Sequence, residues 1–223
     1  MSDELTPAQA SDLARLFRAV QEAMEVRRQV FNQADEINGN HGDHMVQIFD
    51  IAARAAKQQG GAELAEAMDR SGQWLVTCID NGSAQVYARG LTCLAAQFSQ
   101  RQLDLVDLAP YAQVAISGEK RENGQSTGGR SGEILKSLLS ALAEWERLEA
   151  EQPGSGRGMD LGYLLGIGMA YLQAKQQGGD RLRVLAETVV SSSPLGRVPH
   201  RHQSGLLVVQ KILQALGDLP VTD

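Results

Sequence analysis

The sequence predicts an all-α protein, built as an antiparallel bundle of about eight helices. Alanine, leucine, glutamine and glutamate are abundant, and aromatic residues make up only 4% of the 223-residue chain. Alanine, leucine, glutamine and glutamate side chains lose little rotamer freedom in a helix. A large sheet instead needs runs of β-branched and aromatic residues, which are sparse here. Apolar residues also recur at three- and four-residue intervals along most of the chain, which is typical of helices with one buried face.

The first half of the chain divides into five predicted helices. Thr6 and Pro7 suit the N-cap and the first position of the first helix. Its apolar spacing continues to about Ile37 and stops at a turn rich in glycine and asparagine. Short turns rich in Gly, Asn or Asp separate most of the four helices that follow, which we expect over residues 43–59, 62–79, 83–98 and 103–116.

The second half has the same organisation with longer polar connections. Ser131, Asp160 and Asp180 suit the caps of three more helices, and a last helix is expected over 204–216. We expect the connecting loops at 118–132, at 152–158 and, as a basic loop, at 198–203. No long linker divides the helices. Residues 1–223 are therefore expected to form a single domain with a core over about 8–217.

Charge and hydropathy exclude several classes of function. The net charge of −6, with positive and negative residues interspersed, gives no long-range attraction to nucleic acid or anionic lipid. No apolar run reaches the roughly 18 residues of a membrane span, and the first residues lack the features of a secretion signal. Cys78 and Cys93 are too few for a disulfide framework. We therefore expect a cytoplasmic protein with neither a membrane nor a nucleic-acid partner.

Four polar segments carry the candidate binding residues, and each has a plain structural alternative. Residues 38–44 combine two glycines, two histidines and an aspartate, which suits an anion, a metal or an ordinary capped turn. Residues 80–84 open a helix with a Gly-Ser turn, whose free N–H groups suit a phosphate. Residues 128–132 contain one arginine and favour a flexible loop. Residues 195–202 contain two arginines and two histidines, which suit either an anion-binding site or a solvated loop.

The order of these segments carries a family resemblance. Residues 33–45 read Q-A-D-E-I-N-G-N-H-G-D-H-M, residues 81–85 read N-G-S-A-Q, and residues 194–199 read P-L-G-R-V-P, with S-G-L-L at 204–207. They resemble three motifs of the L subunit of dihydroxyacetone kinase: D-x-x-x-x-D-G-D-H-G-x-N-M, G-G-[AS]-S-G, and Y-L-G-E-R-S followed by D-P-G-A. The resemblance covers roughly residues 8–217. It implies an eight-helix barrel that binds ADP or ATP through two Mg²⁺ ions.

The resemblance also implies which residues form the nucleotide site, and it shows where this chain departs from the family. The implied residues are Gln33, Asn38, Asn40, His41, Gly82, Ser83, Ala84, Leu195 and Gly196. Three of them, Gln33, Asn38 and Asn40, are amides where the family has its metal-binding aspartates. Because Mg²⁺ is usually held by carboxylates and phosphates, we expect no bound metal, no resident cofactor and no catalytic residue. Gln85 and Ser204 likewise replace a family glycine and a family aspartate.

The sequence thus predicts a divergent, non-catalytic relative of this kinase subunit with a binding or regulatory role. The ligand would be an anion held by backbone N–H groups and by Arg197 and Arg201. The partner would be a protein, such as a dihydroxyacetone-binding K-type subunit, or a second copy in a homodimer. Two alternatives stay open. One is an active dihydroxyacetone (glycerone) kinase subunit that transfers phosphate from ATP, with Mg²⁺, to a small ketose on a partner subunit. The other is an unrelated helical scaffold.

Overall fold

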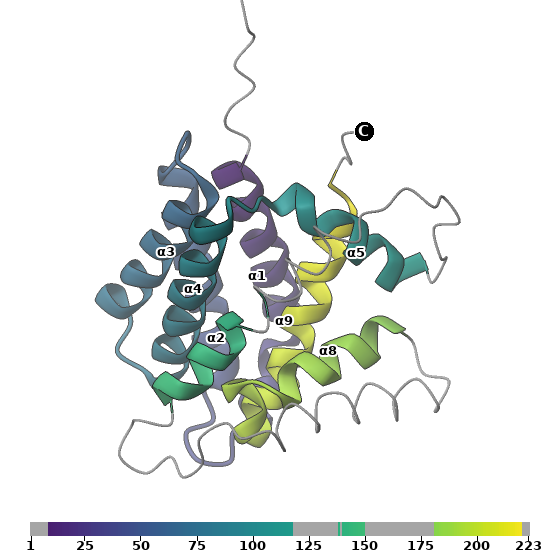
Figure 1. Cartoon of the computed structure of the whole chain (residues 1–223). Coiled ribbons are helices and arrows are strands. Elements are labelled where there is room, and N and C mark those ends of the chain that lie inside the picture. Colours follow the sequence, from purple (N-terminus) through teal and green to yellow (C-terminus); the bar gives the residue numbers. More distant parts are fainter. Residues whose placement is uncertain (1–8, 118–137, 139, 150–180, 220–223) are drawn as a thin grey trace, which may run out of the picture.

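The computed structural model describes residues 9–117, 138, 140–149 and 181–219 (Figure 1). Every regular element in these ranges is helical, which confirms the all-α prediction for this part of the chain. Residues 138 and 140–149 are helical, and the remaining elements are α1 (Gln9–Ala34), α2 (His41–Gln58), α3 (Leu64–Cys78), α4 (Gly82–Arg101), α5 (Leu105–Ser117), α8 (Arg181–Ser191), the 3₁₀ helix η1 (Pro194–Arg197) and α9 (Pro199–Gly217).

The helices pack so that several of their N-termini lie at one end of the molecule. α1 packs on α2 and α9, α3 packs on α4, and α9 also contacts α5 and α8. Because short turns join α1 to α2 and α3 to α4, each pair runs antiparallel (Figure 1). The C-terminus of α1 and the N-termini of α2, α4 and α9 therefore meet at the lower end of the view in Figure 1. No helix among the described residues has both the length and the apolar character needed to cross a membrane.

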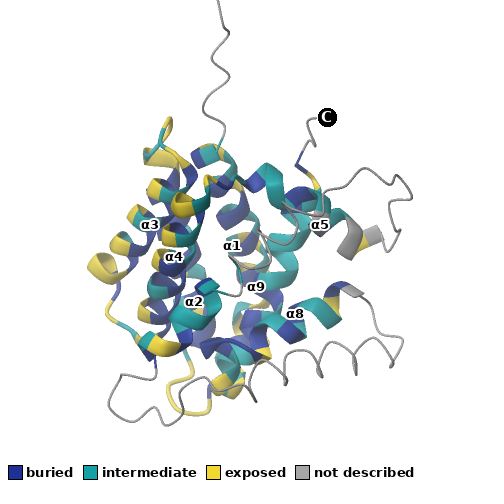
Figure 2. Cartoon of the chain, in the orientation of Figure 1, coloured by how far each residue is buried: buried dark blue, intermediate teal, exposed yellow. Residues whose placement is uncertain are grey.

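A continuous apolar core joins these helices, and its buried residues appear dark blue in Figure 2. α1 contributes a face repeating every three or four residues, which includes Leu13, Phe17 and Val20. The aromatic rings of Phe17 and Phe49 have centroids 6.2 Å apart, and Phe49 meets Tyr87 edge-on at 5.3 Å. This row of rings leads from α1 through α2 to α4, and so connects the core to a tyrosine near the N-terminus of α4.

One sequence prediction is wrong in its secondary structure. Residues 198–203 were expected to form a basic loop, but α9 begins at Pro199, so residues 199–203 are helical. Proline suits the first turn of a helix because its missing N–H would have no intrahelical partner there. The residues just before this helix, Pro194–Arg197, form the 3₁₀ turn η1. The basic side chains of this segment are therefore held on a helix, in fixed directions.

Other predicted boundaries move by a few residues or cannot be followed. α1 ends at Ala34, not near Ile37, because the carboxylate of Asp35 accepts hydrogen bonds from the backbone of the next residues and forms a turn. Several predicted features lie outside the described residues, namely the helix start at Thr6 and Pro7, the caps at Ser131, Asp160 and Asp180, and the loops at 118–132 and 152–158.

Candidate functional site

Three of the four candidate segments meet at the lower end of the fold. The Nε2 atom of His41, at the start of α2, lies 2.8 Å from the hydroxyl oxygen of Ser204 on α9. The rings of His41 and His200 have centroids 4.6 Å apart. A Cβ built on Gly82, at the start of α4, would lie 2.9 Å from a terminal nitrogen of Arg201. We call this region, formed by the 35–41 turn and the first turns of α4 and α9, the loop-end site.

Asp35 organises the turn between α1 and α2. Its carboxylate accepts hydrogen bonds from the N–H groups of Ile37, Asn38 and Asn40, at 3.3, 3.3 and 3.4 Å. Burial acts to raise the pKa of Asp35, but these N–H donors and the nearby His200 outweigh it, so the pKa is lowered. The turn also needs the left-handed conformation of Gly39, whose φ is +67°. Asp35 therefore has a structural role that the sequence did not reveal.

Asp43, the other acid near the family's metal positions, is also engaged. Its carboxylate accepts a hydrogen bond from the amide of Asn32 at 3.0 Å, and its backbone N–H donates to the same amide at 3.1 Å. Arg28 lies 3.6 Å from its second oxygen. These contacts tie the start of α2 to α1.

The three amides that align with the metal-binding aspartates of the resembled family differ in their surroundings. Gln33 and Asn38 are exposed, whereas Asn40 is half-buried. The side-chain oxygen of Asn40 is buried and has no hydrogen-bond partner among the described residues. No group of three or more His, Cys, Asp or Glu side chains is placed to hold a metal within the described ranges. The absence of a bound metal stays a prediction, since the phosphate oxygens of a ligand can also hold Mg²⁺.

His41 and Ser204 form a fully buried polar pair. The Ser204 hydroxyl lies 3.1 Å from the backbone oxygen of Arg201, to which it donates, so its oxygen is available to accept from His41. Burial, aided by His200 and Arg201, lowers the pKa of His41 to about 4, which keeps the imidazole neutral at neutral pH. Ser204 is 0% exposed. A substrate cannot reach this hydroxyl, and the pair instead joins α2 to α9.

The first turn of α4 offers free backbone donors. The side chain of Asn81 caps the helix by accepting from the N–H of Ala84 at 2.8 Å. The N–H groups of Gly82 and Ser83 make no hydrogen bond to another described residue. Gly82 is exposed, while Ser83 and Ala84 are buried. This turn presents unsatisfied donors at the positive end of a helix, where an anion is favoured.

The two arginines predicted to bind an anion have different surroundings. Arg197 is paired with the buried carboxylate of Glu146, from the 140–149 helix. Arg201 is half-buried, its guanidinium makes no ion pair or hydrogen bond within the described part of the chain, and its buried Nε atom has no partner there. Burial lowers the pKa of Arg201, opposed by Glu149 and Tyr87, but an arginine stays charged in proteins. Of these two arginines, Arg201 is thus the one that makes no ion pair with a described residue.

Tyr87 belongs to the site although the sequence did not single it out. It is 9% exposed, and its hydroxyl has no hydrogen-bond partner among the described residues. Burial raises the pKa of Tyr87, against the effect of Arg201 and of the nearby Ser204 hydroxyl, so the phenol stays protonated. One signal was available, because Tyr87 lies four residues after Ser83 and so shares its face of the predicted helix.

Leu195 and Gly196, which the resemblance assigned to the nucleotide site, make packing contacts. Leu195 is 3% exposed and packs against Gly205. A Cβ built on Gly205 would lie 3.2 Å from the Cβ of Leu195. A Cβ on Gly196 would come within 2.6 Å of the backbone oxygen of Val190. Both residues therefore seat η1 between α8 and α9. Arg130, in the third candidate segment, lies outside the described residues.

The Asp35→Asn substitution is expected to destabilise the chain by about 2 kcal/mol, with or without Mg²⁺. The amide loses the negative charge that three backbone N–H groups require, and hydrogen bonds to a charged group are worth about 1.5–3 kcal/mol. Urea denaturation with added Mg²⁺ or EDTA measures both effects, with Glu36→Gln at the exposed neighbour as the control. A parent stabilised by Mg²⁺ and a variant that does not respond would instead identify Asp35 as a metal ligand.

Comparison with protein-family models, with curated proteins and with solved structures found no match to this chain. The family resemblance therefore depends on the motifs and on the way the fold brings them together.

Proposed function

We propose that the chain is a divergent, non-catalytic relative of the L subunit of dihydroxyacetone kinase, with a helical barrel whose loop end binds an anionic ligand. One observation carries the proposal. Three segments that resemble consecutive motifs of that family, separated by up to 163 residues, lie together at one end of the helices. A shared ligand site requires this convergence, and the antiparallel order of the helices provides it.

The lack of catalysis follows from the charge of the site. Transfer of a phosphoryl group relies on metal ions that neutralise the charge between the β- and γ-phosphates. The three family aspartates are replaced here by Gln33, Asn38 and Asn40, which carry no charge. The remaining nearby acids, Asp35 and Asp43, are held in the turn and in the joint between α1 and α2. A binding or regulatory role, with a K-type subunit or another protein as partner, fits this site better than turnover.

Two alternatives make different predictions. An active kinase subunit would bind ATP more tightly with Mg²⁺ and would support turnover of a small ketose when mixed with a K-type subunit. An unrelated scaffold would bind no nucleotide with or without metal.

Calorimetric titration with ADP and ATP, in Mg²⁺ or in EDTA, tests the proposal. We expect Mg²⁺ to leave the affinity of the parent for nucleotide unchanged. The triple variant Gln33→Asp, Asn38→Asp, Asn40→Asp is expected to gain Mg²⁺-dependent ADP binding, since carboxylates restore the ligands that Mg²⁺ prefers. A control variant with the same added charge at exposed glutamines, Gln47→Asp, Gln58→Asp, Gln100→Asp, should gain none. Mg²⁺-dependent turnover by the parent would contradict the proposal and support the active subunit.

A further inference from the structure

We propose that Arg201 takes the place of a metal ion in this protein, so that the loop-end site binds a phosphate group in the absence of any divalent cation. The phosphate would lie between the first turn of α4 and the guanidinium of Arg201. The inference rests on the proposed function only in using the same end of the fold. It names the ligand group and the source of the positive charge.

The first support is the arrangement of helix ends. The N-termini of α2, α4 and α9, at His41, Gly82 and Pro199, meet where His41 contacts Ser204 and Gly82 approaches Arg201. Each helix N-terminus carries a partial positive charge, and together they favour an anion. At α4 the N–H groups of Gly82 and Ser83 are unused by the described residues.

The second support is the unmatched charge of Arg201. Its neighbours differ from it, because Arg89 is paired with Glu149 at 2.5 Å and Arg197 with Glu146. The carboxylate that acts on Arg201 is Glu149, which is already paired with Arg89. Asp35 is occupied by three N–H groups and lies 3.9 Å from His200. A half-buried guanidinium that makes no ion pair within residues 9–117, 138, 140–149 and 181–219 is costly, and a phosphate matches its planar set of donors. The glycine at position 82 leaves the space in which the guanidinium lies.

The third support is independent of the helix ends and of the arginine. The hydroxyl of Tyr87 is buried with its side chain 9% exposed, and no described residue makes a hydrogen bond of good geometry to it, although the Ser204 hydroxyl is close enough to lower its pKa. Buried hydroxyls are almost always hydrogen-bonded in native proteins, so an unpartnered one indicates a missing acceptor. A phosphate oxygen at this place would accept from Tyr87 while another accepts from Arg201.

The donors also define the group that is bound. Two backbone N–H groups, a guanidinium and a phenolic hydroxyl are all donors, and they converge from α4 and α9. A planar carboxylate presents two oxygens, whereas a phosphate presents three or more with nearly two negative charges. The same chemistry is found in inorganic phosphate and in the terminal phosphate of a nucleotide, and titration with each distinguishes the two sources.

The test is calorimetric titration of the full chain in EDTA with inorganic phosphate, ADP and adenosine. We expect phosphate and ADP to bind, adenosine not to bind, and added Mg²⁺ to leave the affinities unchanged. Arg201→Gln is expected to weaken phosphate binding about ten-fold or more, since hydrogen bonds to a charged group are worth 1.5–3 kcal/mol. Arg70→Gln, which removes one positive charge from the exposed face of α3, is the matched control and should change the affinity less than about two-fold.

Tyr87→Phe provides a second variant that keeps the fold. Because the hydroxyl has no partner in the described structure, its removal should leave the melting temperature unchanged while weakening phosphate binding several-fold. If phosphate and ADP bind equally well to the parent and to Arg201→Gln in EDTA, the inference fails and the proposed function stands. If binding requires Mg²⁺, both fail. If ADP binds in EDTA but phosphate and adenosine do not, the inference fails alone.

Discussion

The Gly42→Ala substitution is expected to destabilise the chain by about 3 kcal/mol. A Cβ at this position would overlap the backbone oxygen of Arg28 on α1, and it would also press on the side chain of Asn32. The clash is with backbone, so a change of rotamer cannot relieve it, and α1 and α2 would have to separate along their shared core. Urea denaturation followed by circular dichroism measures the loss.

Gly60→Ala, at the other end of α2, is the matched control. A Cβ there would lie 3.6 Å from the backbone oxygen of Lys57, an ordinary contact, so the stability should change by less than about 0.5 kcal/mol. If Gly42→Ala is as stable as this control, the result would contradict the close approach of α1 and α2 at Gly42. The expected result would explain the matching glycine of the first motif by helix packing, whether or not a ligand is bound.

The stability of the chain is expected to fall as the pH decreases from about 6.5 to about 4, because of His41. Burial first, then His200 and Arg201, lower the pKa of this imidazole to about 4 in the folded state, against 6.5 in the unfolded chain. Between these values the unfolded chain binds a proton that the folded chain does not, so acid favours unfolding. The stabilisation is fully present above pH 6.5, and about 3 kcal/mol of it is lost by pH 4.

Two measurements isolate His41 from the other histidines. NMR titration should show one imidazole that stays neutral well below pH 6. Denaturation at several pH values should show a free energy of unfolding that falls with decreasing pH, and His41→Gln should reduce the slope of this dependence. His200 contributes in the same direction, since burial lowers its pKa as well, so the variant should reduce the slope and not abolish it. An imidazole at position 41 that titrates near pH 6.5 would contradict the buried pair with Ser204.

The helices could be predicted from the sequence because their buried faces repeat along the chain. α2 and α3 begin and end within about two residues of the prediction, as expected when apolar periodicity and glycine turns agree. Residues 198–203 were misread because proline and basic residues suggest a loop as readily as a helix start. The convergence of the three segments could be expected from the alternation of turns with helices that reverse direction, since alternate turns then lie at the same end.

The chemistry of the site was less predictable, for a physical reason. Arg197 and Arg201 look equivalent in sequence, and only the fold places Glu146 beside the first and leaves the buried Nε atom of the second without a partner among the described residues. The sequence did not indicate that the oxygens of Asp35 are used by the backbone of its own turn. Tyr87 lies among apolar residues of α4, so its position in the sequence suggested only a core residue. Pairing and burial depend on tertiary neighbours, which spacing along the chain does not reveal.

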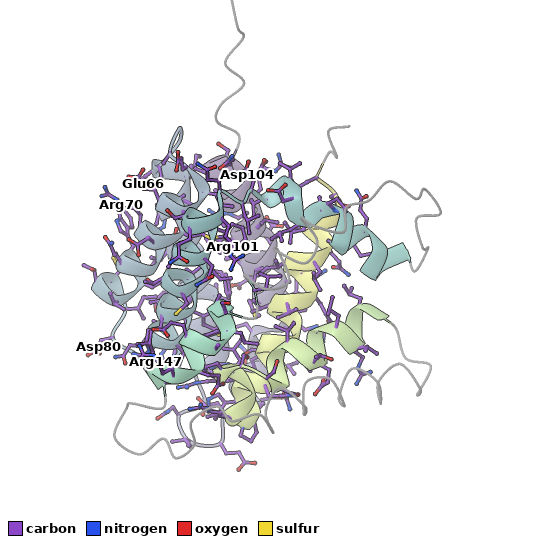
Figure 3. All side chains as sticks on the ribbon, viewed as in Figure 1. Glu66, Arg70, Asp80, Arg101, Asp104 and Arg147 are labelled. Atoms are coloured by element: carbon purple, nitrogen blue, oxygen red, sulfur yellow. The ribbon has the colours of Figure 1, made fainter. Side chains whose placement is uncertain are left out.

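The 140–149 helix sets the distance between α4 and η1. Its Glu149 holds Arg89 of α4, its Glu146 holds Arg197 of η1, and its Trp145 ring packs over Gly90. In Figure 3, Arg147 of this helix and Asp80, which precedes α4, appear at the same end of the molecule. Because the carboxylates of these two ion pairs are buried, mobile ions screen them much less than ion pairs on the surface. The 140–149 helix should therefore keep α4 and η1 at the same spacing when the ionic strength changes.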